Sequence, residues 1–85
     1  MSDTVLDDVR RTAGDVFGVP ADQVSASSSR DTIASWDSLA HVNLVLALEQ
    51  QFGVQFLPEE MMEMLNIELV AMIVSEKLAQ KAAGG

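Results

Sequence analysis

The chain has no cysteine, no long apolar run and few basic residues. Without cysteine it can form neither a disulfide nor a thiolate metal site, so its redox compartment is not constrained. No apolar run approaches the ~20 residues that a membrane-spanning helix needs. The N-terminus lacks the basic and then apolar layout of a secretory signal. We therefore expect a cytoplasmic protein that is not embedded in a membrane.

Basic side chains number five, against thirteen acidic ones, which gives a net charge of −8. This charge disfavours nucleic acid and anionic membranes as partners, favours basic protein surfaces and helps to keep the molecule monomeric. Solubility alone would also explain the acid excess, and composition does not separate the two interpretations. The start at Met1 and the absence of long flanks suggest a discrete protein, although a domain excised from a longer chain would look similar.

Apolar residues recur along much of the chain with a helical period. They predict helices over about residues 4–17, 38–52 and 67–80, and a short helix of about two turns that begins at Pro58. Residues 19–37 have no such period and predict a long polar loop. We expect an all-α fold, a small four-helix bundle of three longer helices and a short third one. It would form a single domain of residues 1–85, with a flexible tail at about 81–85.

Local signals mark the ends of these helices. Glycine in a left-handed conformation commonly ends a helix, proline suits the first turn, and asparagine can cap the N-terminus. The residues in these roles are Gly18, Gly53, Pro58 and Asn66. Within the long loop, three apolar side chains are expected to anchor the chain to the core: Val24, Ile33 and Trp36.

Ser38 stands where the polar loop ends and the second helix begins. A helix N-terminus has unpaired backbone N–H groups and the positive end of the helix dipole, so it favours an anion such as a phosphate. Asp37 is a good N-cap residue, which leaves the Ser38 hydroxyl free. The sequence therefore indicates a modification site at Ser38 in preference to a simple capping serine.

A hydrolase and a metal site are weaker interpretations of the same region. Asp37, Ser38 and His41 lie close in sequence, but a catalytic triad needs the carboxylate behind the imidazole and an oxyanion hole beside the serine. A small bundle also offers no substrate cleft, and His41 is expected to be an ordinary surface residue. The acidic cluster on the short helix has neither a histidine nor a calcium-loop pattern, which is typical of a solvated face.

The stretch Trp36–Leu39 resembles the acyl carrier proteins, whose signature is Asp-Ser-Leu at the start of the second helix. The likeness continues through Val42, the run Leu44–Glu49 and Phe52, and the order of helices and loop extends it over nearly the whole chain. The resemblance implies a carrier with no catalytic activity of its own.

The same resemblance implies a cofactor site at Ser38, with Asp37 and Leu39 beside it. A phosphopantetheinyl transferase with Mg²⁺ would attach 4′-phosphopantetheine from coenzyme A there. Acyl groups would then be held as thioesters and presented to a ligase, acyltransferase, ketosynthase or similar enzyme. The family often shelters the acyl chain between the second, third and fourth helices, which here would be lined by Val42, Leu48, Phe56, Met64 and Val70.

Two departures from the family pattern concern partner choice. Members that serve fatty-acid synthesis usually carry several acids on the second helix, where this chain has only Glu49. In addition, Trp36 replaces the small residue that often precedes Asp-Ser-Leu in the family. Both features resemble carriers of specialised, polyketide-like pathways. We therefore expect apolar docking centred on Leu39 and Leu46. The further docking candidates are Trp36, His41, Glu59, Glu60 and Glu63.

Two alternatives remain open. Peptidyl carrier domains of non-ribosomal peptide synthesis share the fold and the serine, but typically have glycines and a His or Asp before Ser-Leu. The stretch Ser35–Asp37 lacks that glycine pair, so an acyl carrier is preferred. Outside the carrier class, the chain could be an unmodified interaction module whose apolar second helix binds a partner helix.

Overall fold

A computed structural model describes residues 2–84, which form helices and loops with one isolated bridge between Ser29 and Asn66. The elements in chain order are α1 (Ser2–Phe17), the 3₁₀ turn η1 (Ala21–Gln23), α2 (Ser38–Phe52), α3 (Pro58–Met62) and α4 (Ile67–Gly84). The predicted all-α fold of three longer helices and a short third one is confirmed.

Two boundaries differ from the expectation. α3 has only five residues and is therefore shorter than the two turns predicted. It ends at Met62, with Glu63 as its C-cap, because the chain must soon begin α4, which Asn66 caps. α4 continues to Gly84, so residues 81–84 of the expected tail are helical. Residue 85 lies outside the described part of the chain.

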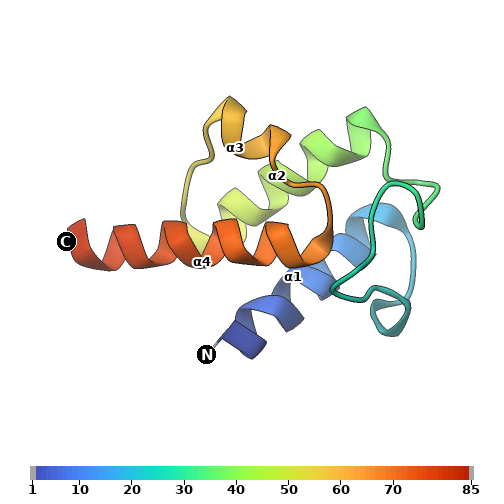
Figure 1. The fold of residues 1–85 in the computed structure, drawn as a ribbon, viewed down its shortest axis with the longest axis horizontal. Helices are drawn as coiled ribbons and strands as arrows, with labels where there is room; N and C mark the ends of the chain where they lie inside the picture. Colours follow the sequence, from blue (N-terminus) through green and yellow to red (C-terminus); the bar gives the residue numbers. More distant parts are fainter. Residues whose placement is uncertain (1, 85) are drawn as a thin grey trace.

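The core lies between the three longer helices. α1 packs most extensively against α4 and also along α2, and α4 runs along the long axis of the molecule (Figure 1). Each long helix contributes apolar side chains at helical spacing, and their removal from water is the main stabilising term. The fully buried ones from these helices are Val9, Ala13, Leu44, Leu48, Ile67, Val70 and Val74.

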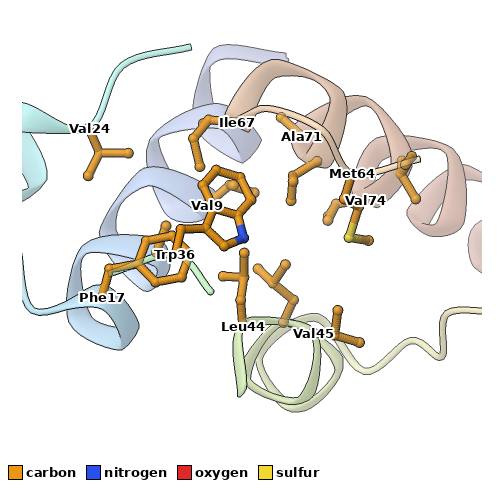
Figure 2. Packing of buried hydrophobic residues seen from close by; sticks show 14 of the residues in the cluster. Val9, Phe17, Val24, Trp36, Leu44, Val45, Met64, Ile67, Ala71 and Val74 are labelled. Carbon is orange, nitrogen blue, oxygen red and sulfur yellow. The ribbon is translucent and has the colours of Figure 1, made fainter. Parts of the chain in front are cut away.

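The long loop is ordered by apolar anchors, as predicted. Val24, Ile33 and Trp36 are all buried in the core cluster. The Trp36 indole stacks on the Phe17 ring, with 4.9 Å between the ring centroids. Figure 2 shows Trp36 in the middle of the cluster, between Phe17 and Leu44. The loop therefore crosses the end of α1 before it reaches α2.

Backbone hydrogen bonds fix the same loop to α1 and α4. The N–H groups of Ile67 and Glu68 donate to loop carbonyls at 3.0 and 2.8 Å, those of Ser28 and Ala26. The Arg10 guanidinium, on α1, donates to the carbonyls of two further loop residues. These bonds set the path of the chain into the first turn of α2.

No helix within residues 2–84 combines the length and the apolar character that crossing a membrane requires.

Candidate functional site

Ser38 is the first residue of α2, and its side chain is exposed. Asp37 is the N-cap residue, as predicted, with an extended backbone. Its Oδ1 accepts a hydrogen bond from the Ala40 N–H at 2.8 Å, and its carbonyl accepts one from the His41 N–H at 2.8 Å. Among the described residues, no hydrogen bond involves the Ser38 hydroxyl.

The first turn of α2 suits a phosphate on that hydroxyl. Asp37 takes the N–H of Ala40, which leaves the N–H groups of Ser38 and Leu39 for another acceptor. The positive end of the helix dipole lies at the same place, and no acidic residue follows Asp37 in the first turn. The residues present therefore fit a phosphodiester at Ser38.

His41 is buried, with 7% of its surface exposed, so the expectation of an ordinary surface residue that takes part in docking is wrong. Its Nδ1 accepts a hydrogen bond from Trp36 Nε1–H at 3.0 Å. Its Nε2 lies 2.9 Å from the Met61 carbonyl. Because an indole N–H can only donate and a carbonyl can only accept, both bonds require the neutral imidazole with its proton on Nε2.

The expectation that Trp36 takes part in docking is also wrong. Trp36 is 2% exposed and sits in the core, where it stacks on Phe17 and donates to His41. The polar tip of a buried indole needs an acceptor, which explains why a histidine lies inside this core. The sequence signal for this contact was the five-residue spacing of Trp36 and His41 across a helix N-terminus. The same spacing also fits structures in which the two side chains do not meet.

The trio of Asp37, Ser38 and His41 is not assembled for catalysis. The Asp37 carboxylate caps the helix, and both nitrogens of His41 are engaged with groups other than Ser38. No base is therefore aimed at the Ser38 hydroxyl. Within residues 2–84, no three histidine or acidic side chains are grouped so that they could hold a metal ion.

Glu60, predicted for docking, is instead engaged within the fold. Its Oε1 accepts from the Leu57 N–H at 2.7 Å and lies 2.8 Å from the Lys77 Nζ on α4. Partial burial raises the pKa of Glu60, but the Leu57 N–H and the Lys77 ammonium outweigh it, so the pKa lies below its ordinary value of 4.5. This residue joins the start of α3 to α4, while Glu59 and Glu63 remain exposed.

Leu39, Val42 and Leu46 form an exposed row on α2, which we call the α2 apolar face. Leu39 is 72% exposed, and the other two are about half exposed. The spacing of three and four residues places all three on one side of the helix. Val42 was expected to line an interior acyl site, but in this structure it lies at the surface.

The other four predicted lining residues are buried: Leu48, Phe56, Met64 and Val70. They come from α2, α4 and the segments on either side of α3, so the structure brings them into one core. Met64 also borders a groove of about 490 Å³ between α3 and the loop segment 29–31.

The only acid of α2 also has an internal role that the sequence did not reveal. Glu49 Oε2 accepts a hydrogen bond from the Phe56 N–H at 2.9 Å, which holds the chain between α2 and α3. The outward surface of α2 is therefore apolar and neutral at its centre.

A model of the phosphopantetheine attachment site family matches residues 7–74, a span that includes Ser38 and most of the chain. The chain belongs to this family. It is thus a phosphopantetheine carrier protein and not an enzyme, and the cofactor of such carriers is covalently attached. The resemblance predicted from Trp36–Leu39 is confirmed at the level of the family.

The carrier is similar to acyl carrier proteins over nearly its full length. It is 32% identical over 76 residues to that of Petrotoga mobilis, with 89% of each chain covered. It is 29% identical over 75 residues to that of Thermosynechococcus vestitus, with 88% of this chain and 93% of the relative covered. The solution structure of the holo acyl carrier protein from Geobacter metallireducens matches with a TM-score of 0.85 and 30% identity, over 95% and 93% of the two chains.

Proposed function

We propose that Ser38 carries the 4′-phosphopantetheine and that this single-domain carrier serves a specialised, polyketide-like pathway in the cytoplasm. The observation that supports Ser38 is its exposed hydroxyl at the first position of α2, free because Asp37 caps the helix. The N–H groups of Ser38 and Leu39 and the helix dipole would stabilise the attached phosphate.

In the loading step, a phosphopantetheinyl transferase with Mg²⁺ joins Ser38 Oγ to the phosphorus next to the pantetheine of coenzyme A. The bond from that phosphorus to the adenosine bisphosphate part breaks, and the hydroxyl proton passes to a base on the transferase, because His41 faces away into the core. The arm supplies the thiol that this chain lacks, on which acyl groups are carried as thioesters.

The test is an intact mass after incubation with coenzyme A, Mg²⁺ and a broad-specificity phosphopantetheinyl transferase. We expect the mass to rise by one phosphopantetheine in the native chain and in Ser35→Ala, the nearest serine as a control. Ser38→Ala should gain nothing. An adduct in Ser38→Ala, or none in the native chain with several transferases, would contradict the proposal and favour an unmodified interaction module.

Partner enzymes would dock by apolar contact on the α2 apolar face, mainly at Leu39 and Leu46. Both are exposed, and the one acid of α2 is engaged with the Phe56 N–H. A face with so little charge differs from the acidic second helix of carriers in fatty-acid synthesis, which supports a specialised pathway. Glu59 and Glu63 would supply the acidic part of the docking surface.

We expect Leu39→Ala and Leu46→Ala each to lower the kcat/KM of transferase loading about tenfold, the usual cost of removing an apolar anchor from an interface. Asn43→Ala, also exposed on α2, serves as the control and should change little. Loading is measured by mass against time. Unchanged loading in both leucine variants would refute this docking surface.

The acyl chain would shelter among Leu48, Phe56, Met64 and Val70, between α2, α3 and α4. Two contacts hold α3 over this region, the His41–Met61 hydrogen bond and the Lys77–Glu60 ion pair. A five-residue helix is not stable alone, so its movement would be the simplest way to admit a chain.

A further inference from the structure

A second apolar groove lies between α3 and α4, and no residue of α2 lines it. It has a volume of about 430 Å³. We call it the α3–α4 groove, and its lining residues are Met62, Glu63, Leu65, Leu69, Met72, Ile73 and Glu76. This groove is separate from both Ser38 and the α2 apolar face.

The walls of the α3–α4 groove are strongly exposed apolar side chains. Leu65 is 66% exposed, Met72 is 53% exposed, and Met62 is more exposed than either. Ile73 is buried beneath them and forms the floor. Contiguous exposed apolar surface of this kind marks interaction sites, and methionines adapt to a partner of variable shape.

The charged residues of the groove indicate which kind of partner it fits. Glu63 and Glu76 both line it and both are exposed. Among the described residues, the ion pairs of this chain involve other acids, Asp7 and Glu60. Glu49 and Glu60 are used inside the fold, whereas Glu63 and Glu76 are exposed and border the apolar side chains of this groove.

We propose that the α3–α4 groove binds a basic amphipathic helix of a partner protein. Leucine-like side chains of that helix cover Leu65, Met72 and the Ile73 floor, and its lysines or arginines pair with Glu63 and Glu76. A second copy of this chain is a poor occupant, because each copy has a net charge of −8 and brings the same acids to the contact.

Such a partner would leave the first turn of α2 accessible. One protein held at the α3–α4 groove and another enzyme at the α2 apolar face could therefore bind the carrier at the same time. In this arrangement the α3–α4 groove would recognise a basic partner, and the α2 apolar face would recognise an apolar one.

The probe is a synthetic amphipathic helical peptide of about 15 residues, roughly four turns, with leucines on one face and lysines on the other. Its counterpart with glutamates in place of the lysines is the charge control. Both are titrated into the ¹⁵N-labelled full chain and followed by amide chemical shifts. We expect the lysine peptide to perturb α3 and the first half of α4 most, and the glutamate peptide to bind far more weakly.

Two exposed-residue variants separate the surfaces. Met72→Ala should weaken binding of the lysine peptide about tenfold, whereas Leu39→Ala, on the α2 apolar face, should leave the affinity within about twofold. Ser38→Ala should bind like the native chain, which keeps the result independent of attachment at Ser38. Largest shifts on α2, equal binding of both peptides, or no binding would overturn the proposal.

Discussion

The Trp36 indole and the His41 imidazole form a buried polar pair inside an otherwise apolar core. Trp36 donates to His41, and His41 donates to the Met61 carbonyl, so one ring joins the long loop, α2 and α3. His41 lies within a turn of Ser38, on the same helix. The two side chains that the sequence suggested for docking are instead bonded to each other beneath the first turn of α2, which contains Ser38.

A double-mutant cycle tests this pair. Trp36→Phe leaves His41 Nδ1 buried without its donor, and His41→Leu leaves both the Trp36 N–H and the Met61 carbonyl without partners. Each single change should cost about 1–3 kcal/mol of the free energy of unfolding, plus a contribution from altered packing. The double variant should be more stable than the sum predicts, by about 1 kcal/mol.

Urea unfolding of the four proteins, followed by far-UV circular dichroism, gives these values. Additive effects would show that the Trp36–His41 hydrogen bond contributes nothing specific.

Among the helices, α3 depends most on contacts outside itself. It has five residues, too few for a helix to be stable in isolation. Pro58 fits its first turn, and Glu60 satisfies the Leu57 N–H just before it. Lys77, from α4, then pairs with the same Glu60 oxygen. The Glu60 carboxylate therefore stabilises both the start of α3 and the contact of α3 with α4.

Glu60→Gln should lower the free energy of unfolding at pH 7 by about 0.5–1 kcal/mol, as expected for a partly exposed ion pair. Because the pKa of Glu60 is lowered by folding, its carboxylate stabilises the fold above the ordinary value of 4.5. That contribution is lost as the pH falls through the lowered pKa. The stability difference between the native chain and Glu60→Gln should therefore shrink on acidification.

Chemical unfolding at several pH values from 7 to about 3 measures this difference, a range that spans the usual glutamate pKa. Glu59→Gln, the exposed neighbour, is the matched control and should show little difference from the native chain at any pH. A Glu60→Gln difference that stays constant with pH would contradict the assigned role of the ion pair.

For the whole molecule, burial and charge are distributed unevenly. The packing of α1 on α4 and α2, with the loop anchors, forms the continuous core. The exposed apolar side chains lie on α2, in the α2 apolar face, and on α3 and α4, in the α3–α4 groove. A carrier that interacts with other proteins needs exposed surface, and these two sets of exposed apolar side chains are available for such contacts.

The sequence by itself determined the features that depend on near neighbours in the chain. The helical periods, the Asp37 cap, the left-handed Gly53, Pro58 at a first turn and the Asn66 cap all follow from local sterics and hydrogen bonding. Local rules also placed the Ser38 hydroxyl at a helix N-terminus.

Only the tertiary structure decided which side chains face a partner. Trp36 and His41 became core residues because the loop path carries the indole between α1 and α2, where its N–H must find an acceptor. Glu60 forms an ion pair within the fold because α4 brings Lys77 to it. Burial and pairing of this kind depend on residues distant in sequence. The helical period of the sequence alone does not show which polar or aromatic side chains another helix or loop will cover.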